Sequence, residues 1–454
     1  MNNELRTFAI TTLGCKVNQY EGRQIRQLLE SSGLTAAPLS AAPDLVVVNT
    51  CCVTHIASAK SRHYISKARK HSPHAAIVVR GCLPTASTGE LNKIDDSIYL
   101  VGHNQNLQAE LLRLITGQTA APQNDTKDTL SKTAIDPKIK HKNKLPQELP
   151  ALISYAGQTR AFLKIQDGCD GYCTYCIVRT IRTNLYSKNP AEVLAEAHNL
   201  VAAGHKEIVL TGIFLGAFGR HTVRRKQWQP INPSPLAEIV DKLAQIDGLA
   251  RLRLSSLEPA DVTEELLDVF ARHKAIIAPH LHLPLQSGSD DVLTRMCRQY
   301  RTDEFLAGIA LAEKYLDRPA ITTDIIAGFP GETDADFEKT LLLAQQVGFA
   351  KMHIFPFSAR KGTPAFKMEG HLHPDVISAR AAQLAELDTT LAEKFKTRFV
   401  GQQATVIVEA THPFAKGRTE RYFMLRLPPG HYHKNDRVTI DITPDSLTVK
   451  DTGE

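Results

Sequence analysis

The sequence predicts an α/β protein with an N-terminal doubly wound parallel sheet, a central partial β/α barrel and a small C-terminal all-β barrel. Strand-like apolar runs alternate with helical stretches twice, from about Thr7 to Thr116 and again from Ala161, which predicts the two parallel sheets. After Gly401 only short strand-like runs remain, which predicts the β module. The 454 residues leave room for about three domains of roughly 150 residues each.

The N-terminal region, 5–116, shows the first alternation. Apolar runs predict its strands, and helical periodicity predicts the helices between them. We expect strands at Phe8–Thr12, Leu45–Asn49 and Ile77–Arg80, and helices at Tyr20–Ser32 and Ala57–Lys70.

Residues 117–150 are rich in proline and lysine and poor in large apolar side chains, which is typical of a surface linker. A basic arm that touches RNA is the alternative. The region 151–395 then repeats a strand about every 30 to 45 residues, a spacing that suits β/α units. Six units favour a complete or partial barrel, and a second open sheet remains the alternative. The strands are expected at Phe162–Ile165, Ile208–Thr211, Leu252–Ser255, Leu281–Leu285, Ile321–Ile326 and Met352–Phe355.

A helix is expected over Asp375–Phe395, with an apolar stripe at helical spacing. The module 396–454 follows it. Its strands are expected at Ala404–Glu409, Tyr422–Leu427 and Arg437–Ile442.

Composition narrows the class of protein. The hydrophobic fraction of 43% and the charged fraction of 22% are ordinary for a soluble globular protein. The sequence has neither an apolar run of membrane-spanning length nor a basic start followed by an apolar stretch, so we expect a cytoplasmic protein with reduced cysteines. The net charge of +6 permits a polyanionic partner without requiring one.

Three cysteines, Cys169, Cys173 and Cys176, form a C-x3-C-x2-C loop after the first strand of the predicted barrel. In such barrels the loops after the strands build the active site. Three thiolates on one short loop can hold an iron–sulfur cluster and leave one iron open for a substrate. The alternatives are a zinc site completed by a histidine, although zinc sites prefer paired C-x2-C knuckles, and unligated thiols.

Three further cysteines, Cys15, Cys51 and Cys82, each lie just past a predicted strand of the N-terminal region. The carboxyl ends of parallel strands meet at one edge of the sheet, so these cysteines are expected to converge there. This predicts a second cluster, and the alternative is that they are small buried side chains. Cys52 and Cys297 are not expected to be ligands.

At this point the sequence resembles a known family. The C-x3-C-x2-C loop, with Tyr175 before its last cysteine, resembles the radical S-adenosylmethionine (SAM) superfamily, and the three spread cysteines resemble its methylthiotransferases. Thr12–Glu21 resembles the N-terminal signature of the threonylcarbamoyladenosine tRNA branch. The resemblance extends over nearly the whole chain through His282–Ser289, Thr323–Thr333, Phe355–Ser358, Gly362–Ala365 and Gly417–Tyr422, the last being similar to the family's RNA-associated TRAM barrel.

The resemblance implies a reaction at C2 of N6-threonylcarbamoyladenosine 37 (t6A37) of tRNA, where a sulfur and a methyl group are inserted. That carbon is neither acidic nor a good electrophile, so a cofactor must supply a radical. The implied cofactors are SAM and two [4Fe-4S] clusters, a radical-generating one on Cys169, Cys173 and Cys176 and an auxiliary one on Cys15, Cys51 and Cys82. The implied partners are tRNA carrying t6A37 and a reductant protein.

Other site residues are weaker expectations, because each depends only on its place at a strand end or in the basic C-terminal module. Contacts with SAM are expected from Tyr175, Thr211, Gly212, Glu258, Gln286, Ser287, Asp324 and Gly328. Contacts with RNA are expected from Arg418, Arg421 and Tyr422.

The sequence departs from the family pattern in two stretches. In the stretch after Cys176, Arg179 stands where the family usually has a proline, and Thr183 replaces the glycine that usually follows an arginine. Leu83–Thr85 also lacks a glutamine that often follows the third N-terminal cysteine. The alternative functions are methylthiolation of isopentenyladenosine tRNA, methylthiolation of a ribosomal-protein side chain, and a non-catalytic iron–sulfur RNA-binding protein that needs no SAM.

Overall fold

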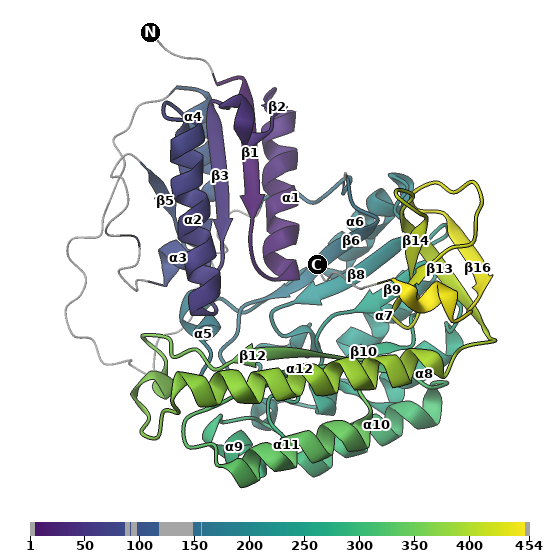
Figure 1. Cartoon of the computed structure of the whole chain (residues 1–454). Coiled ribbons are helices and arrows are strands. Elements are labelled where there is room, and N and C mark those ends of the chain that lie inside the picture. The colour runs from purple at the N-terminus through teal and green to yellow at the C-terminus, as the bar shows by residue number, and fades with distance from the viewer. Residues whose placement is uncertain (1–4, 87–90, 92–97, 118–148, 156, 450–454) are drawn as a thin grey trace. The chain divides into compact units, whose positions relative to one another are not determined.

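The computed structural model describes residues 5–86, 91, 98–117, 149–155 and 157–449 (Figure 1). The chain forms two compact units. The first takes Met1–Ala151 and the short segment Thr180–Asn184, and the second takes Leu152–Arg179 and Leu185–Glu454. The segment Thr180–Asn184 lies within the stretch predicted as barrel, yet it packs with the N-terminal unit. The predicted linker 117–150 falls, apart from its ends, outside the described residues.

The first unit is a parallel sheet in the order β2-β1-β3-β4-β5. Strand order reverses between β1 and β3, which is typical of a doubly wound fold and confirms the prediction. All three predicted strands are present, whereas the short β2 and β5 were not predicted. The strands are β1 (Thr7–Thr12), β2 (Thr35–Ala36), β3 (Leu45–Thr50), β4 (Ala76–Gly81) and β5 (Tyr99–Val101). The helices are α1 (Lys16–Ser31), η1 (Leu39–Ala41), α2 (His55–His71), α3 (Cys82–Thr85) and α4 (Leu107–Ile115).

The core of this unit explains why these strands form. β3 is buried along its whole length, as expected for a central strand covered by helices on both faces. Leu45 and Val47 face a core that includes Leu29 of α1 and Leu111 of α4. α2 instead buries Ile65 against the sheet.

The second unit contains the predicted barrel. Six strands run parallel in the order β6-β8-β9 and β10-β11-β12, and isolated bridges from Leu252 to Ile277 and from Ser256 to His282 join the two halves. β10 is shorter than predicted, because the Thr323 hydroxyl accepts from the N–H of Leu285 and donates to the carbonyl of Leu283, which replaces the backbone ladder there. The strands are β6 (Arg160–Asp167), β7 (Tyr186–Ser187), β8 (Glu207–Gly212), β9 (Arg251–Leu254), β10 (His280–His282), β11 (Ala320–Ala327) and β12 (Lys351–Pro356).

The helices of the second unit follow its strands. They are α5 (Val178–Ile181), which ends inside the segment that packs with the first unit, α6 (Pro190–Ala202), α7 (Pro235–Ala244), α8 (Glu264–Arg272), α9 (Asp290–Arg295), α10 (Thr302–Tyr315), α11 (Asp334–Val347) and α12 (Pro374–Thr397). α12 is the predicted helix 375–395, and it runs along the edge strand β12 (Figure 1). Short 3-10 turns lie at η2 (Leu215–Ala217), η3 (Arg225–Gln227), η4 (Pro259–Asp261), η5 (Pro364–Lys367) and η6 (Asp445–Thr448).

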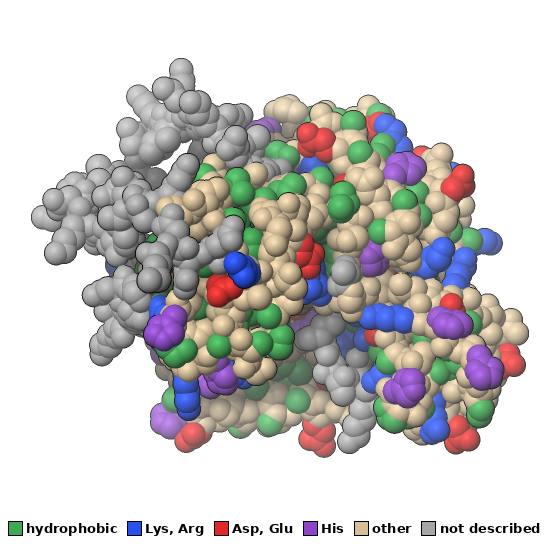
Figure 2. Space-filling view, turned by 90° about the horizontal axis from the view of Figure 1, so that it is seen from above, with side chains coloured by type: hydrophobic (Ala, Val, Ile, Leu, Met, Phe, Trp, Pro, Cys, Tyr) green, Lys and Arg blue, Asp and Glu red, His purple; other side chains and the backbone are tan. Residues whose placement is uncertain are grey.

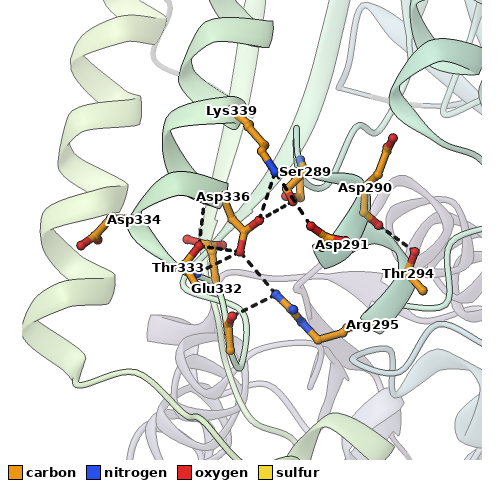
Figure 3. A network of polar contacts seen from close by, with 12 residues as sticks. Ser289, Asp290, Asp291, Thr294, Arg295, Glu332, Thr333, Asp334, Asp336 and Lys339 are labelled. Atoms are coloured by element: carbon orange, nitrogen blue, oxygen red, sulfur yellow. Dashed lines mark hydrogen bonds and ion pairs between the residues drawn. The ribbon is translucent and has the colours of Figure 1, made fainter.

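A polar network fixes the starts of α9 and α11 (Figure 3). Thr333 and Asp336 form a capping box at the start of α11, which satisfies backbone N–H groups that the first turn leaves open. Asp336 also accepts a hydrogen bond of 2.6 Å from Ser289, just before α9. Arg295 at the end of α9 donates to the carbonyl of Gly331. The network therefore ties two of the family-like motifs together.

The C-terminal module is an antiparallel sheet in the order β15-β14-β13-β16. The strands are β13 (Gln403–Ala410), β14 (Lys416–Thr419), β15 (Met424–Arg426) and β16 (Arg437–Asp441). β14 was not predicted, since its sequence Lys-Gly-Arg-Thr lacks strand-forming apolar residues. No described helix is long and apolar enough to cross a lipid bilayer.

A buried ion cluster fastens this module to the barrel within the second unit. Glu207 of β8 pairs with Arg251 and Arg253 of β9 at 3.3 and 2.9 Å. The two guanidinium groups continue to backbone carbonyls of the module: Arg251 donates to Thr405 and Arg418, and Arg253 to Thr419 and Glu420. Paired and hydrogen-bonded in this way, the three charges can be buried.

Candidate metal centres

The barrel cysteines lie on one loop that rises from the end of β6. The buried Gln166 shapes this loop, since its amide donates to the carbonyls of Asp167 and Gly168 and accepts from the N–H of Phe214. Gly171 donates its N–H to Cys169 Sγ at 3.4 Å, and a Cβ at this glycine would lie 3.2 Å from the same sulfur. Glycine therefore lets the backbone pass close to the sulfur.

Loops after other strands hold the cysteine loop in place. Asp170 accepts hydrogen bonds from the hydroxyl of Thr222 and the N–H of Val223. Thr174 donates to the carbonyls of Arg295 and Met296, at the end of α9, and accepts from the N–H of Ala365. The loop is thus fixed from three other parts of the same unit.

Arg298 brings predicted site residues to the cysteines. Its guanidinium donates to Cys173 Sγ at 3.2 Å and to the Tyr175 hydroxyl at 3.4 Å, and it pairs with Glu258 at 2.6 Å. Glu258 also pairs with Arg225 at 3.3 Å. Burial by itself would lower the pKa of Arg298. The charge interactions with Tyr300, Tyr175 and Glu258 outweigh burial and hold this pKa well above its usual value. A permanent positive charge therefore lies beside Cys173.

The N-terminal cysteines come from three separate strands. Cys15 follows β1, Cys51 follows β3, and Cys82 opens α3 directly after β4. β1 and β3 flank the point where the strand order reverses, which is where doubly wound folds bind ligands. Gly14 has φ +99°, and a Cβ there would lie 2.8 Å from Cys51 Cβ. All three cysteines thus lie at the same edge of the sheet, as expected, and their binding of a cluster stays a prediction.

A buried polar clamp, formed by Asn18, Glu21, Asn49 and Arg182, surrounds the strand ends that carry these cysteines. Asn18 donates to the carbonyls of Leu13 and Thr50, and the amide of Asn49 donates to the carbonyl of Asn18. Arg182 forms a two-point ion pair with Glu21 at 2.8 and 3.0 Å and donates to Asn18 at 2.9 Å. The clamp fixes the loops that lead to Cys15 and Cys51.

Cys15, Cys51, Cys169 and Cys176 are in environments that disfavour a bare thiolate. Burial raises the pKa of Cys51 to about 12, of Cys169 to about 12 and of Cys176 to about 11, and it also raises the pKa of Cys15. Cys82 differs, because a hydrogen bond from the thiol of Cys52 holds its pKa well below the usual value. Desolvated cysteines that cluster in this way become thiolates when a metal takes the proton's place.

Two further side chains, His103 and Arg182, influence the protonation of the N-terminal cysteines. His103 places Nε2 3.9 Å from Cys82 Sγ, and burial lowers the pKa of this histidine. Arg182 is the positive charge that lowers the thiol pKa values of Cys15, Cys51 and Cys82 alike, against the effect of burial. The positive charge favours the deprotonated form of all three cysteines.

The residues predicted to contact SAM fall into different surroundings. Tyr175 and Glu258 lie at the barrel cysteines through Arg298. Thr211 and Gly212 end β8, and a Cβ at Gly212 would lie 3.0 Å from Gln166, so this glycine lets β8 approach the residue that shapes the cysteine loop.

Of the remaining four residues, Asp324 lies inside β11, Gly328 directly follows β11, and Gln286 and Ser287 lie on the loop after β10. Ser287 is buried against Thr340 of α11, and Gly328 has φ +79° and donates its N–H to Glu332. Gln286 donates its N–H to the carbonyl of Asp324, whose side chain faces His282 at 3.3 Å. SAM contacts by all eight residues stay predictions.

The three residues predicted to contact RNA take part in packing within the second unit. Arg418 is 4% exposed and donates to Glu409 and to the carbonyl of Tyr422. Tyr422 stacks on His280 with ring centroids 4.6 Å apart, and Arg421 pairs with Glu420 and Asp317. Their contact with RNA stays a prediction.

Sequence reasoning missed Arg182, Arg298 and His103. Arg182 is separated from Glu21 by 161 residues, and nothing in the local pattern predicts that pairing. The one available signal was the family-like stretch after Cys176, in which Arg182 occupies the position of the usual arginine. Arg298 lies next to Cys297, a cysteine that is not expected to be a ligand and that is exposed with φ +54°.

Comparison with known proteins identifies this combination of sites. Residues 163–344 match the family model described as the radical SAM superfamily, and residues 7–102 match that of the uncharacterized protein family UPF0004. The chain is 35% identical over 407 residues to the threonylcarbamoyladenosine tRNA methylthiotransferase MtaB of Bacillus subtilis, covering 89% of this chain and 85% of that protein. The chain belongs to the radical SAM methylthiotransferase family.

Other methylthiotransferases are nearly as similar. The MtaB protein of Thermotoga maritima is 34% identical, covering 89% of this chain and 87% of that protein. A tRNA-2-methylthio-N(6)-dimethylallyladenosine synthase of Parafrankia is also 34% identical, covering 89% and 78%. Among solved structures, the radical SAM methyltransferase TsrM of Kitasatospora setae, with cobalamin and a [4Fe-4S] cluster bound, has a TM-score of 0.55 at 14% identity, covering 80% of this chain and 74% of that one. That likeness concerns the fold.

The residues present fit the cofactors of this family, SAM and [4Fe-4S] clusters. Each set offers three thiols and therefore leaves one iron of a four-iron cluster without a cysteine. The glycines at 14 and 171 keep the space beside the cysteine sulfurs free of side chains. The backbone N–H of Gly171 and the guanidinium of Arg298 supply the donors to sulfur that stabilise such a cluster.

Proposed function

We propose that this protein methylthiolates C2 of t6A37 in tRNA, in the cytoplasm, with electrons from a reductant protein. The observation that carries the proposal is the pair of three-cysteine sets, each at the carboxyl edge of its own parallel sheet. A radical enzyme that only abstracts hydrogen needs the barrel set alone. The second set supports an enzyme that must also deliver sulfur. The MtaB relatives support the choice of t6A as substrate.

The chain's own residues have separate tasks in this reaction. Cys169, Cys173 and Cys176 would hold the cluster that, when SAM is bound, supplies a 5′-deoxyadenosyl radical. Arg298 places a fixed positive charge beside Cys173, where it stabilises electron density on the sulfur. Glu258 holds the Arg298 guanidinium in this position and offers a carboxylate at the same place.

The N-terminal residues would hold the sulfur-donating cluster. Cys15, Cys51 and Cys82 bind it, and the polar clamp keeps two of the three cysteine loops in register. Since the clamp is buried, it also excludes water from the base of this site. Exclusion of water matters because reactive sulfur and carbon radicals are quenched by side reactions.

The tRNA partner requires a basic surface. Exposed basic and histidine side chains lie on the C-terminal module, over the right-hand part of the face in Figure 2. Arg426, whose guanidinium lies 4.8 Å from the Phe414 ring, pairs a cation with an aromatic face as single-stranded RNA binders do. We propose that these exposed groups contact the tRNA backbone. They are His412, Arg426, His431, His433 and Lys434.

The experiment is anaerobic turnover by the reconstituted full chain with SAM, dithionite and tRNA that carries t6A37. Nucleoside mass spectrometry should show the 2-methylthio derivative of t6A, and 5′-deoxyadenosine should appear with it. If isopentenyladenosine tRNA is converted instead, the proposed methylthiolation reaction is right and t6A37 is the wrong substrate. A complete lack of 5′-deoxyadenosine from protein with full iron content would favour a non-catalytic RNA-binding protein.

A further inference from the structure

Three side chains of the barrel form a group apart from both cysteine sets. His282 of β10, Asp324 of β11 and His353 of β12 each place one ring nitrogen or carboxylate oxygen within 4.8 Å of the others. His282 Nε2 lies 3.3 Å from Asp324 Oδ1, and the two histidine rings are 5.7 Å apart. We call these three residues the lumen group.

The lumen group lies on the inner face of the barrel. The strand register pairs Asp324 directly with His353, and His282 with Thr322, so all three side chains share one face of the sheet. The residues of the opposite face are fully buried, as expected under the helices that cover a barrel from outside. They are Leu281, Thr323, Ile325 and Met352.

The side chains of the lumen group have a fixed orientation and can be reached by solvent. The Thr322 hydroxyl lies 2.9 Å from His282 Nδ1, which fixes the ring so that Nε2 faces Asp324. His282 and Asp324 are half-buried, and His353 is exposed. Oriented polar groups that solvent can reach inside a barrel are typical of a ligand-binding lumen. The same strands lead to the edge from which the cysteine loop rises, since β6 runs parallel to them through β8 and β9.

We propose that the lumen group binds the polar substituent on N6 of the substrate base. A threonylcarbamoyl substituent carries a carboxylate, a hydroxyl and amide N–H groups. Two histidine rings can donate to its carboxylate, and Asp324 can accept from its hydroxyl or N–H groups. An isopentenyl substituent has neither donors nor acceptors, so it would displace water from these groups without replacing the hydrogen bonds.

This inference rests on the proposed function and deepens it, because it assigns the choice between substrate bases to three residues. A site built to hydrogen-bond a substrate rejects an analogue that lacks the partner groups far more strongly than an apolar pocket rejects a polar one. The lumen group would therefore act in specificity, separately from the cysteines that carry the chemistry.

The test measures binding without turnover. The reconstituted full chain, without SAM, is titrated with anticodon stem–loops that carry t6A37, unmodified A37 or isopentenyladenosine 37, and Kd is measured by fluorescence anisotropy. We expect t6A37 to bind about tenfold or more tightly than A37, the factor for one or more hydrogen bonds to a charged group. His353→Leu and His282→Leu should bring this ratio close to one and leave the Kd for A37 unchanged.

Two matched variants control the test. His353→Gln keeps a hydrogen-bonding side chain and should retain part of the preference for t6A37. His198→Leu removes an exposed histidine on α6, outside the lumen, and should retain all of it. Iron content and the thermal unfolding midpoint should be the same in every variant, since a damaged barrel would lower both.

Several outcomes would overturn the inference. One is a full preference for t6A37 in both leucine variants, and another is an equal loss of affinity for t6A37 and A37. A third is an equimolar non-iron metal in the wild-type protein that disappears in His353→Leu, since two histidines and a carboxylate also suit a transition metal. If the wild-type protein fails to convert t6A37 under turnover conditions, the proposed function itself is wrong. If it converts t6A37 while the variants keep their preference, only the lumen group's role is wrong.

Discussion

The two cysteine sets each offer three thiols, but the chain assembles them differently. The barrel set comes from eight consecutive residues, and neighbouring loops of its own unit hold it. The N-terminal set comes from three strand ends and is held by the buried clamp. One residue of this clamp, Arg182, comes from a segment far along the chain. A local site tolerates change in its surroundings, whereas an assembled site depends on them. The N-terminal set should therefore be the more sensitive of the two to substitutions outside its cysteines.

The largest effects should separate the two sets by product. Cys173→Ala should abolish 5′-deoxyadenosine formation and remove half of the bound iron. Cys51→Ala should also remove half of the iron and abolish methylthiolation, yet leave 5′-deoxyadenosine formation intact. Iron analysis and chromatography of both products measure this. Persistent cleavage of SAM by Cys173→Ala would show that the barrel set was assigned the wrong role.

The next effect tests the clamp. Arg182→Gln leaves Glu21 buried without its cation, which should cost about 3–5 kcal/mol of the first unit's stability. The loss of a positive charge near three thiolates should also lower the reduction potential of the N-terminal cluster. Potentiometric electron paramagnetic resonance measures the potential, and thermal unfolding measures the stability.

A matched control for the clamp is Arg26→Gln on the same helix as Glu21. Arg26 forms an exposed ion pair with Glu30, with side chains 40% and 45% exposed, and such pairs contribute about 1 kcal/mol or less. An unchanged reduction potential in Arg182→Gln would contradict an electrostatic role and leave Arg182 a purely structural residue.

Arg298 provides the corresponding test in the barrel set. Arg298→Lys keeps the charge but cannot maintain contacts with Cys173, Tyr175 and Glu258 at once. We expect SAM cleavage to slow about 10–100-fold, as for other changes to groups that support metal ligands. Iron content should stay unchanged, because the cysteine loop has its other anchors. A loss of iron equal to that in Cys173→Ala would mean that the barrel set depends on its surroundings as much as the N-terminal set does.

The same contrast explains what the sequence could predict. Both cysteine sets were predictable, the first from local spacing and the second from the position of each cysteine after an apolar run. The six barrel strands were predictable from their apolar periodicity. Arg182 and the grouping of His282, Asp324 and His353 were not, because each depends on contacts between residues that are distant in sequence, although Asp324 by itself was expected at the site as a SAM contact. Arg418 and Arg421 look like surface cations in the sequence, and only the tertiary fold shows that Glu409 and Asp317 pair with them.

Glu207, like Glu21, is a buried carboxylate paired with arginine, but its arginines bind the C-terminal module instead of supporting a cysteine set. Desolvation would raise the pKa of Glu207, but Arg253 and Arg251 prevail and lower it to about 2 from 4.5. Its stabilisation is therefore complete above pH 4.5 and is lost as the pH falls toward 2, by about 3 kcal/mol in total.

Glu207→Gln should abolish this acid-dependent part and destabilise the second unit at neutral pH, while cluster potentials stay unchanged. Urea unfolding at pH 7 and at about pH 2.5, near the lower end of this window, measures it. Glu238→Gln is the control, since that carboxylate forms an exposed pair with Lys242. An acid profile that is the same in wild type and Glu207→Gln would contradict the assignment.

The smallest effect should come from the network of Figure 3, which supports the barrel set from a distance. Ser289 donates to Asp336, and this contact anchors the start of α9, whose end supplies the Arg295 carbonyl that holds Thr174 beside Cys173. Ser289→Ala removes one buried hydrogen bond and should cost about 1–2 kcal/mol of stability. SAM cleavage should fall only slightly, because Asp170 and Ala365 still hold the cysteine loop. Thr294→Ala, on the exposed side of α9, is the control and should change neither stability nor SAM cleavage. A large loss of SAM cleavage in Ser289→Ala would show that the barrel set depends on distant contacts more than its own hydrogen bonds indicate.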